Sequence, residues 1–318
     1  MKKVNELIYY YTLSKIHQKT INNENIRRYL NNKKIVNNRV LSSEKVNRVI
    51  YEYLIDSKPF MAGRFGATEL SAIKTFDFKL KSKYSIVMNQ MAMWSGFFPK
   101  SDKLGKKFTD LMIPLIQEAD VMGIWMLPFE EYYLKTYGSK TLETTYLLDL
   151  EPWSCPENPW SAALAKKKVL VIHPFAETIK KQYQRREEIF PGTNILPEFD
   201  LKVLKAVQTI AGEKDERFDT WFDALEWMYK EAMKIDFDVA IIGCGAYGFP
   251  LAAKLKQAGK QAVHLAGATQ LLFGIRGKRW EENDAFAYVQ QFFNEAWVYP
   301  SDEDKPKLAN KVEDGCYW

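Results

Sequence analysis

Three glycines in the segment GCGAYG have the spacing of a phosphate-binding turn. Gly243, Gly245 and Gly248 match G-x-G-x-x-G, directly after an apolar, β-branched run at 239–242 and before an amphipathic helix pattern. In such a turn the first glycine permits a tight bend, the second lets backbone approach a phosphate, and the third lets the helix pack closely. The helix N-terminus favours an anion. The segment therefore predicts a phosphate site, with a ligand-free structural turn as the alternative.

The next strand is expected at 262–265, and a loop rich in basic residues (270–279, the basic loop) follows it. Flexible backbone with fixed cations suits a pyrophosphate. A dinucleotide site would also need an acidic side chain about 20 residues past the glycines, but residues 266–268 are Ala-Gly-Ala. The missing acid disfavours an oxidoreductase that uses NAD(P). Together with the glycines, the residues predicted to bind a phosphate ligand here are Tyr247, Gln270, Arg276, Lys278 and Arg279.

Two further groups of polar residues also follow expected strands. Arg64, Gly66 and Glu69 come after the strand at 60–63, and His173 ends the strand at 169–172. A carboxylate such as Glu69 can hold a divalent cation or accept a proton. His173 is a candidate base at neutral pH, with a purely structural role as the alternative. Because the carboxyl ends of parallel strands meet at one edge, we expect these residues and the glycine turn to share one rim.

The fold class follows from strands that alternate with helices over residues 60–265. This alternation predicts an α/β fold with a mostly parallel, doubly wound, Rossmann-like sheet and helices on both faces. Helices are expected at 178–190, 221–234 and 284–297, among others. The expected organisation is a basic helical N-terminal extension (1–57), a catalytic α/β domain (58–300) and a C-terminal tail (301–318). The proline-rich segment 128–165 is a candidate lid or seam.

Charge is distributed unevenly. Residues 1–50 contain 11 Lys and Arg and 3 Asp and Glu, whereas the whole chain has a formal net charge of +5. The basic head could touch anionic lipid, or it could be a solvated helical extension. No nucleic-acid recognition module accompanies it, so no nucleic-acid partner is expected. Without a signal peptide or an apolar run of about 20 residues, we expect a cytoplasmic protein. Contact of the head with anionic lipid, the alternative to a solvated extension, would place it on the inner face of the membrane.

The residues above resemble the motifs of bacterial glycosyltransferases of the GT-D fold. The resemblance rests on Arg64-Phe65-Gly66 with Glu69, and on the segments 243–248 and 274–280. It spans about 59–297 and leaves the basic head outside. The family pattern reads Arg-Phe-Gly-Asp-Gly-Glu, in which the aspartate and glutamate bind a metal ion on the diphosphate. Ala67 stands here in place of that aspartate, so dependence on Mn²⁺ or Mg²⁺ stays open, and neutralisation by arginines is favoured.

The resemblance implies a glycosyltransferase that uses a nucleotide sugar, a UDP-sugar, to build cell-surface polysaccharide or glycoprotein glycan. The acceptor would be a glycan or a lipid-linked glycan. The glycine turn and the basic loop would bind the diphosphate, Arg64 and Glu69 the donor or a metal ion, and His173 would act as base. Two alternatives remain, a non-catalytic scaffold that binds nucleotide sugars and, less favoured, an NAD(P)-dependent oxidoreductase.

Overall fold

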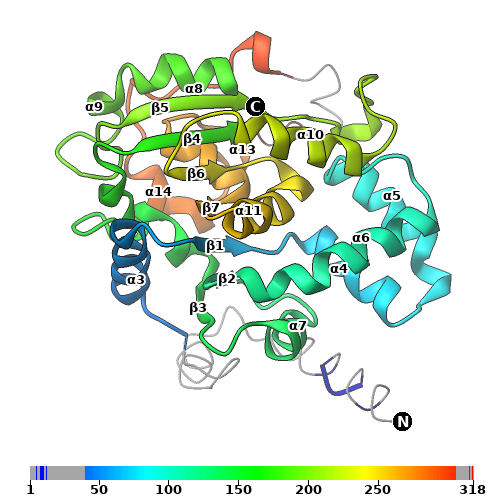
Figure 1. Cartoon of the computed structure of the whole chain (residues 1–318). Coiled ribbons are helices and arrows are strands. Elements are labelled where there is room, and N and C mark those ends of the chain that lie inside the picture. Colours follow the sequence, from blue (N-terminus) through cyan, green and yellow to red (C-terminus); the bar gives the residue numbers. More distant parts are fainter. Residues whose placement is uncertain are drawn as a thin grey trace.

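A seven-stranded parallel sheet forms the centre of the molecule (Figure 1). The computed structural model describes residues 5, 8–10, 12, 40–305, 315 and 317. The strand order is β3-β2-β1-β7-β6-β4-β5, which confirms the predicted α/β class. The strands are β1 (Phe60–Arg64), β2 (Val121–Ile124), β3 (Glu143–Tyr146), β4 (Lys168–His173), β5 (Asp200–Lys205), β6 (Val239–Ile242) and β7 (Gln261–His264).

Helices cover both faces of this sheet because alternate residues of its strands point to opposite sides. On β6, Ala240 and Ile242 belong to one hydrophobic core, and Val239 and Ile241 to the other. The first core is closed by α4 (Ala67–Asp77), α5 (Tyr84–Trp94), α6 (Asp102–Leu115), α7 (Glu130–Tyr137), α10 (Trp221–Met233) and α11 (Gly248–Gln257). The second is closed by α3 (Ser43–Asp56), α8 (Ala176–Tyr183), α9 (Arg186–Ile189), α12 (Thr269–Leu272), α13 (Lys278–Glu281) and α14 (Ala287–Gln290).

The segment 128–165, expected as a lid or seam, is packed into the body. It contains α7 and the edge strand β3. The strand was not predicted from the sequence because it has only four residues and most of them are polar. Trp153 and Trp160 are buried in the second core. The Trp160 indole N–H donates to Leu150 O at 2.9 Å, and its backbone N–H donates to Asn47 Oδ1 at 2.9 Å. The second of these hydrogen bonds joins the segment to α3.

Two predicted helices are shorter than expected. The helix predicted at 284–297 ends at Gln290, after a 3₁₀ turn at Asp284–Phe286. Beyond it, the Asn294 amide donates to Glu188 O at 3.1 Å, so a tertiary contact replaces the helical hydrogen bonds. The helix predicted at 178–190 is divided into α8 and α9. The predictions of a long helix were therefore wrong at both places.

The two ends of the chain are tied to the body where the structure describes them. Helix α3 falls within the predicted extension 1–57, yet Val46, Ile50 and Leu54 are fully buried in the second core; most of residues 1–39 lie outside the described residues. In the tail, Asp304 accepts hydrogen bonds from the Thr178 backbone N–H and hydroxyl, both at 2.8 Å. Within the described residues, no helix has the length and apolar character needed to cross a bilayer.

Candidate functional site

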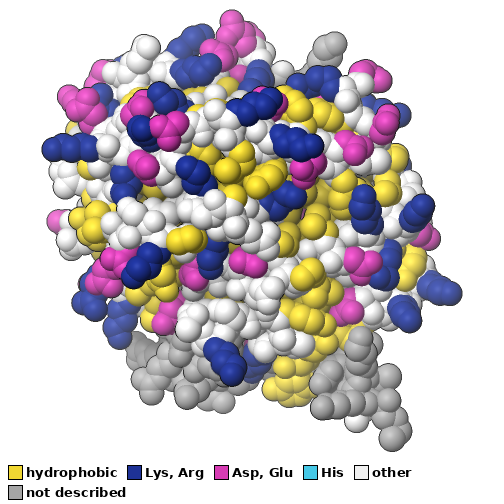
Figure 2. Space-filling model, in the orientation of Figure 1, with side chains coloured by type: hydrophobic (Ala, Val, Ile, Leu, Met, Phe, Trp, Pro, Cys, Tyr) yellow, Lys and Arg dark blue, Asp and Glu magenta, His cyan; other side chains and the backbone are white. Residues whose placement is uncertain are grey.

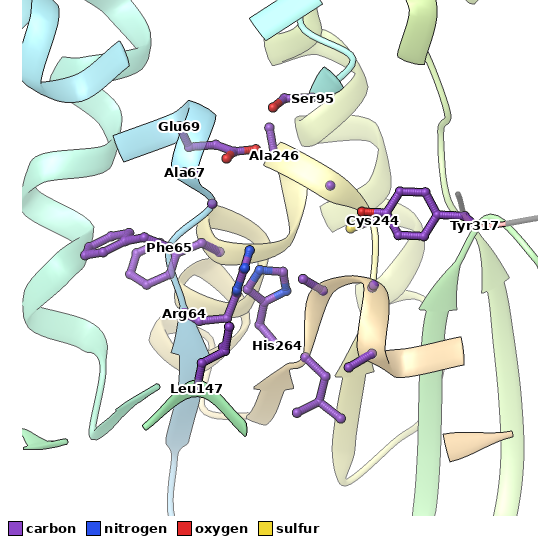
Figure 3. Close-up of a pocket in the computed structure, with 18 of the residues that line it drawn as sticks. Arg64, Phe65, Ala67, Glu69, Ser95, Leu147, Cys244, Ala246, His264 and Tyr317 are labelled. Carbon is purple, nitrogen blue, oxygen red and sulfur yellow. The ribbon is translucent and has the colours of Figure 1, made fainter. Parts of the chain in front are cut away.

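A cavity of about 1040 Å³ lies along the carboxyl edge of the sheet. Residues at or just after the ends of β1, β2, β3, β4, β6 and β7 line it, and the close-up in Figure 3 shows part of this lining. Arg64, Glu69, His173 and the glycine turn all belong to it. The structure therefore brings together the three groups that the sequence predicted on one rim.

Arg64 ends β1 and carries an unpaired charge into the cavity wall. Among the described residues its guanidinium makes no hydrogen bond or ion pair, and its Nε is buried without a partner. It stacks on Trp125, with Cζ 4.6 Å from the ring centroid. Burial lowers the pKa of Arg64, while the charge of Glu69 acts in the opposite direction. Figure 3 shows the side chain extending beside His264, so Arg64 is positioned to receive an anion.

Glu69 lies in the first turn of α4, directly over the backbone of Gly66. A Cβ at Gly66 would come 1.6 Å from Glu69 Oε2, so only glycine leaves room for this carboxylate. Mg²⁺ and Mn²⁺ sites commonly need one or two carboxylates in octahedral arrangement. Here Ala67 offers a methyl group in place of the second carboxylate, and the described residues contain no cluster of three ligating side chains. The described residues therefore lack the second carboxylate of the metal site that the resemblance implies.

The three glycines of the turn differ in how much space surrounds the position of a Cβ atom. A Cβ at Gly243 would lie 2.5 Å from Ala266 O, and one at Gly248 would lie 2.1 Å from His264 Cε1, so these two glycines permit close packing. Gly245 has φ +57 and only Ser95 O near its Cβ position, at 3.7 Å. It lines the cavity. Of the three glycines, Gly245 is therefore the one whose backbone is open to the cavity.

Only one of the three predicted cations of the basic loop reaches the cavity. Arg279 lines it, donates to the Tyr317 hydroxyl at 2.7 Å and stacks on that ring at 4.5 Å. Arg276 instead points to Glu281, with Nε 3.4 Å from Oε1, and Lys278 is exposed outside the cavity lining. The expectation that all three cations face one diphosphate is corrected. Lys278 and Arg279 are successive residues of the short helix α13 and point in different directions, and Arg276, which precedes that helix, is held by Glu281.

Gln270 and Tyr247, both predicted as ligand contacts, have structural partners instead. The Gln270 amide donates to Ile275 O, Arg276 O and Tyr317 O at 3.2 to 3.3 Å, which holds the loop in place. Tyr247 stacks on the buried Trp221 with ring centroids 4.9 Å apart. Its hydroxyl lies 3.2 Å from the Thr209 hydroxyl. Although both residues border the cavity, their polar groups brace its walls.

The two histidines of the cavity are weak bases. Burial lowers the pKa of His173 and of His264 to about 3. His173 Nδ1 accepts the backbone N–H of Phe175 at 3.0 Å, so a neutral ring carries its proton on Nε2 and acts there as a donor. The geometry thus opposes the predicted role of His173 as a base. His264 Nδ1 lies 3.2 Å from Ile242 O and its ring packs on Gly248.

Glu151 is a cavity residue that the sequence reading missed. Its side chain is 5% exposed, and it accepts a hydrogen bond from the Tyr288 hydroxyl at 2.6 Å. Burial raises the pKa of the Glu151 carboxyl to about 7, and the Tyr288 hydrogen bond opposes this rise. A carboxyl with such a pKa can exchange a proton at neutral pH. The signal in the sequence was a pair of carboxylates, Asp149 and Glu151, in a segment otherwise rich in leucine, proline and tryptophan.

Aromatic rings make up much of the remaining wall, and such surfaces suit a nucleobase or the apolar face of a sugar. They come from α5, from the ends of β2 and β3, and from the segment after the basic loop. The rings in question are those of Trp94, Trp125, Tyr146, Trp280, Phe286, Tyr288 and Tyr317. The cavity therefore combines two arginines, three acidic residues and an open backbone turn with flat apolar surfaces.

No known family profile matches the chain, and no curated protein matches it. Two solved structures are similar to it, each with a TM-score of 0.41 and 13% sequence identity over 82% of this chain and 96% of the other. One is described by the statement that the highly conserved domain of unknown function 1792 has a distinct glycosyltransferase fold, and the other is a selenomethionine-substituted structure of that domain.

Proposed function

We propose that the chain transfers a sugar from a UDP-sugar to a glycan or lipid-linked glycan acceptor. The observation that carries this proposal is Arg64 in the cavity wall, whose Nε is buried without a hydrogen-bond partner and whose guanidinium forms no ion pair among the described residues. A buried, unpaired cation destabilises the fold unless an anion joins it. A diphosphate held by Arg64, Arg279 and the backbone of Gly245 would supply that anion.

In the proposed reaction the acceptor hydroxyl oxygen forms a bond to the anomeric carbon of the donor. The bond from that carbon to the diphosphate oxygen breaks, and UDP leaves with the electron pair. Arg64 and Arg279 neutralise the charge that develops on the diphosphate. Glu151, as a carboxylate, takes the proton of the acceptor hydroxyl. Holding donor and acceptor in one cavity removes most of the entropic barrier to this step.

The remaining cavity residues have supporting roles in this proposal. Glu69, fixed over Gly66, accepts hydrogen bonds from hydroxyls of the donor sugar. The Nε2–H of His173 donates to the bound ligand. Trp125 and its aromatic neighbours hold the base and the sugar rings by stacking. The biological setting that fits a UDP-sugar donor is cytoplasmic assembly of cell-surface polysaccharide or of glycoprotein glycan.

Ligand-induced thermal stabilisation tests the proposal, because a ligand that binds the native state raises its apparent stability. UDP should raise the melting temperature in the presence of EDTA, whereas NAD(H) should not. Arg64→Met should raise the melting temperature of the ligand-free protein by a few degrees, since it removes a buried charge, and should abolish the shift caused by UDP. Saturable stabilisation by NAD(H) with no effect of UDP would favour an oxidoreductase.

Turnover separates an enzyme from a binding scaffold. A panel of UDP-sugars should yield one or more donors from which the protein releases UDP, and Glu151→Gln should slow that release while leaving the thermal shift by UDP in place. Binding of UDP without release from any donor of the panel, with acceptor glycans present, would instead identify a nucleotide-sugar-binding scaffold.

A further inference from the structure

An uncharged helix beside the cavity presents apolar side chains to solvent. Helix α5 contains no Asp, Glu, Lys or Arg. Ile86, Met93 and Trp94 are 60%, 37% and 46% exposed, whereas Val87 and Met91, on the opposite side, are buried in the first core. Trp94 also lines the cavity. The exposed face of α5 therefore adjoins the cavity mouth.

The exposed residues of α5 form one continuous face. Ile86 and Met93 are seven residues apart, which is two helical turns, and Asn89 lies between them on the same side. The Lys100 ammonium donates to Asn89 Oδ1 at 3.1 Å. The ammonium group of Lys100, in the segment that follows α5, is thus held beside the apolar face.

The charged side chains of the segment that carries α5 have a single sign. Residues 78–101 contain Lys79, Lys81, Lys83 and Lys100 and no acidic residue. All four lysines are exposed, and none of them forms an ion pair within the part of the chain that the structure describes. In Figure 2, dark blue and yellow side chains lie side by side along the edge where Figure 1 places α5, with some magenta side chains among them. The face is therefore apolar at its centre and cationic at both ends.

We propose that this face of α5 docks on a bilayer that contains anionic phospholipids. Apolar side chains with lysines at the margin match a helix that lies in the plane of the membrane interface, and tryptophan is enriched at that depth. The lysines complement the negative surface of an anionic leaflet. Three exposed apolar side chains are too few to form the buried centre of a stable protein–protein interface, so the charge and the size of the face together favour lipid.

Docking in this orientation would turn the cavity mouth, at Trp94, toward the membrane surface. If the proposed function is correct, an acceptor carried on a lipid would reach the cavity without leaving the bilayer. This consequence rests on the proposed function, whereas docking itself does not, because vesicle binding requires no sugar transfer. A failure of the docking proposal is therefore distinguishable from a failure of the proposed sugar transfer.

Sedimentation with lipid vesicles tests the docking. The full chain should bind vesicles of phosphatidylcholine and phosphatidylglycerol in equal parts, and bind phosphatidylcholine vesicles at least tenfold more weakly. The double variant Ile86→Asp, Met93→Asp should lose at least tenfold in affinity for the anionic vesicles. Acyl chains that carry bromine should quench tryptophan fluorescence in the parent protein more than in Trp94→Phe, since Trp94 is the exposed ring of this face.

The matched control is the double variant Tyr51→Asp, Ile55→Asp on α3, where the two side chains are 40% and 53% exposed. It makes the same change in charge and in apolar exposure on another helix, and it should retain binding within twofold. Equal losses in both double variants, or no loss in either, would overturn the proposal. The second result would place any lipid contact elsewhere, as in the basic N-terminal head. Absence of vesicle binding by the parent would overturn it as well.

Discussion

The carboxylate of Glu69 occupies the space that a side chain at Gly66 would fill, because a Cβ there would lie 1.6 Å from Glu69 Oε2. Gly66 has φ −76, which any residue can adopt. The glycine is therefore needed for room and not for backbone conformation. The pair explains why a glycine stands three residues before this glutamate at the end of β1.

Gly66→Ala should displace the Glu69 carboxylate, since a flexible side chain yields to a new methyl group. We expect a change in melting temperature of only a few degrees, and a loss of turnover equal to that of Glu69→Ala. In the Glu69→Ala background, Gly66→Ala should cause no further loss, because two changes that act on one group are not additive. Rates of UDP release from the four proteins measure this, and additive losses would contradict the steric relationship.

Gly245→Asn should abolish stabilisation by UDP while the protein stays folded. Asparagine tolerates the left-handed conformation at φ +57, but its side chain would project toward the space that a phosphate would occupy. Gly192→Asn is the control, because Gly192 has φ +74 with nothing within 4 Å of its Cβ position and lies outside the cavity lining. Thermal shifts with UDP should distinguish the two variants; equal shifts would remove the phosphate role of Gly245.

Arg279→Met and Arg276→Met should behave differently although the residues are three apart. Arg279 lines the cavity, whereas Arg276 is held by Glu281 and by Tyr299, with its Cζ 4.9 Å from that ring centroid. Calorimetric titration with UDP should show affinity reduced about tenfold or more for Arg279→Met, as expected for loss of a charged hydrogen bond, and unchanged for Arg276→Met. Similar losses in both variants would restore the idea of one cationic cluster.

Stability should depend on pH through Glu151. Its pKa is raised from 4.5 to about 7 by burial, so the folded state retains this proton at pH values where the unfolded chain has lost it. Stability from this group is therefore fully present below about pH 4.5, and it falls as the pH rises to about 7. The fall amounts to about 3 kcal/mol at most.

The isosteric variant Glu151→Gln isolates that contribution, because it cannot ionise. Its free energy of unfolding relative to the parent should increase between pH 5 and pH 8 in denaturant titrations. Glu130, whose pKa burial also raises to about 7, remains in both proteins and cancels in the difference. A difference that is constant with pH would mean that Glu151 ionises as it does in water, and would remove the basis for its proposed role in proton transfer.

The substitution Ala67→Asp should make UDP binding depend on a divalent metal ion. UDP binding by the parent should be the same in EDTA and in Mn²⁺, because Ala67 leaves Glu69 without a second carboxylate. Ala67→Asp should make UDP bind more tightly in Mn²⁺ than in EDTA, since two carboxylates and phosphate oxygens suit that ion. Calorimetric titration decides it: parental binding that vanishes in EDTA and returns with Mn²⁺ would show that Glu69 serves as a ligand alone.

The sequence by itself determined the parallel sheet and its rim. Continuous apolar runs such as 239–242 can be buried only between two layers of helices, and the ends of parallel strands must meet at one edge. Arg64, Glu69, His173 and Gly245 could therefore be placed together from local pattern alone. The short polar strand β3 could not, because its pairing with β2 and the burial of Thr144 and Thr145 depend on neighbours remote in sequence.

Tertiary structure alone decided which way the side chains of the site point. Arg276 and Arg279 have the same charge and lie in the same loop, so the sequence does not distinguish them. The contact with Glu281 directs Arg276 away from the cavity, and the contact with Tyr317 holds Arg279 at the cavity wall. The pKa values of His173 and Glu151 likewise depend on burial by segments far along the chain, since desolvation penalises the charged form of each. Sequence fixes the types of residue at the rim, whereas packing sets their direction and protonation.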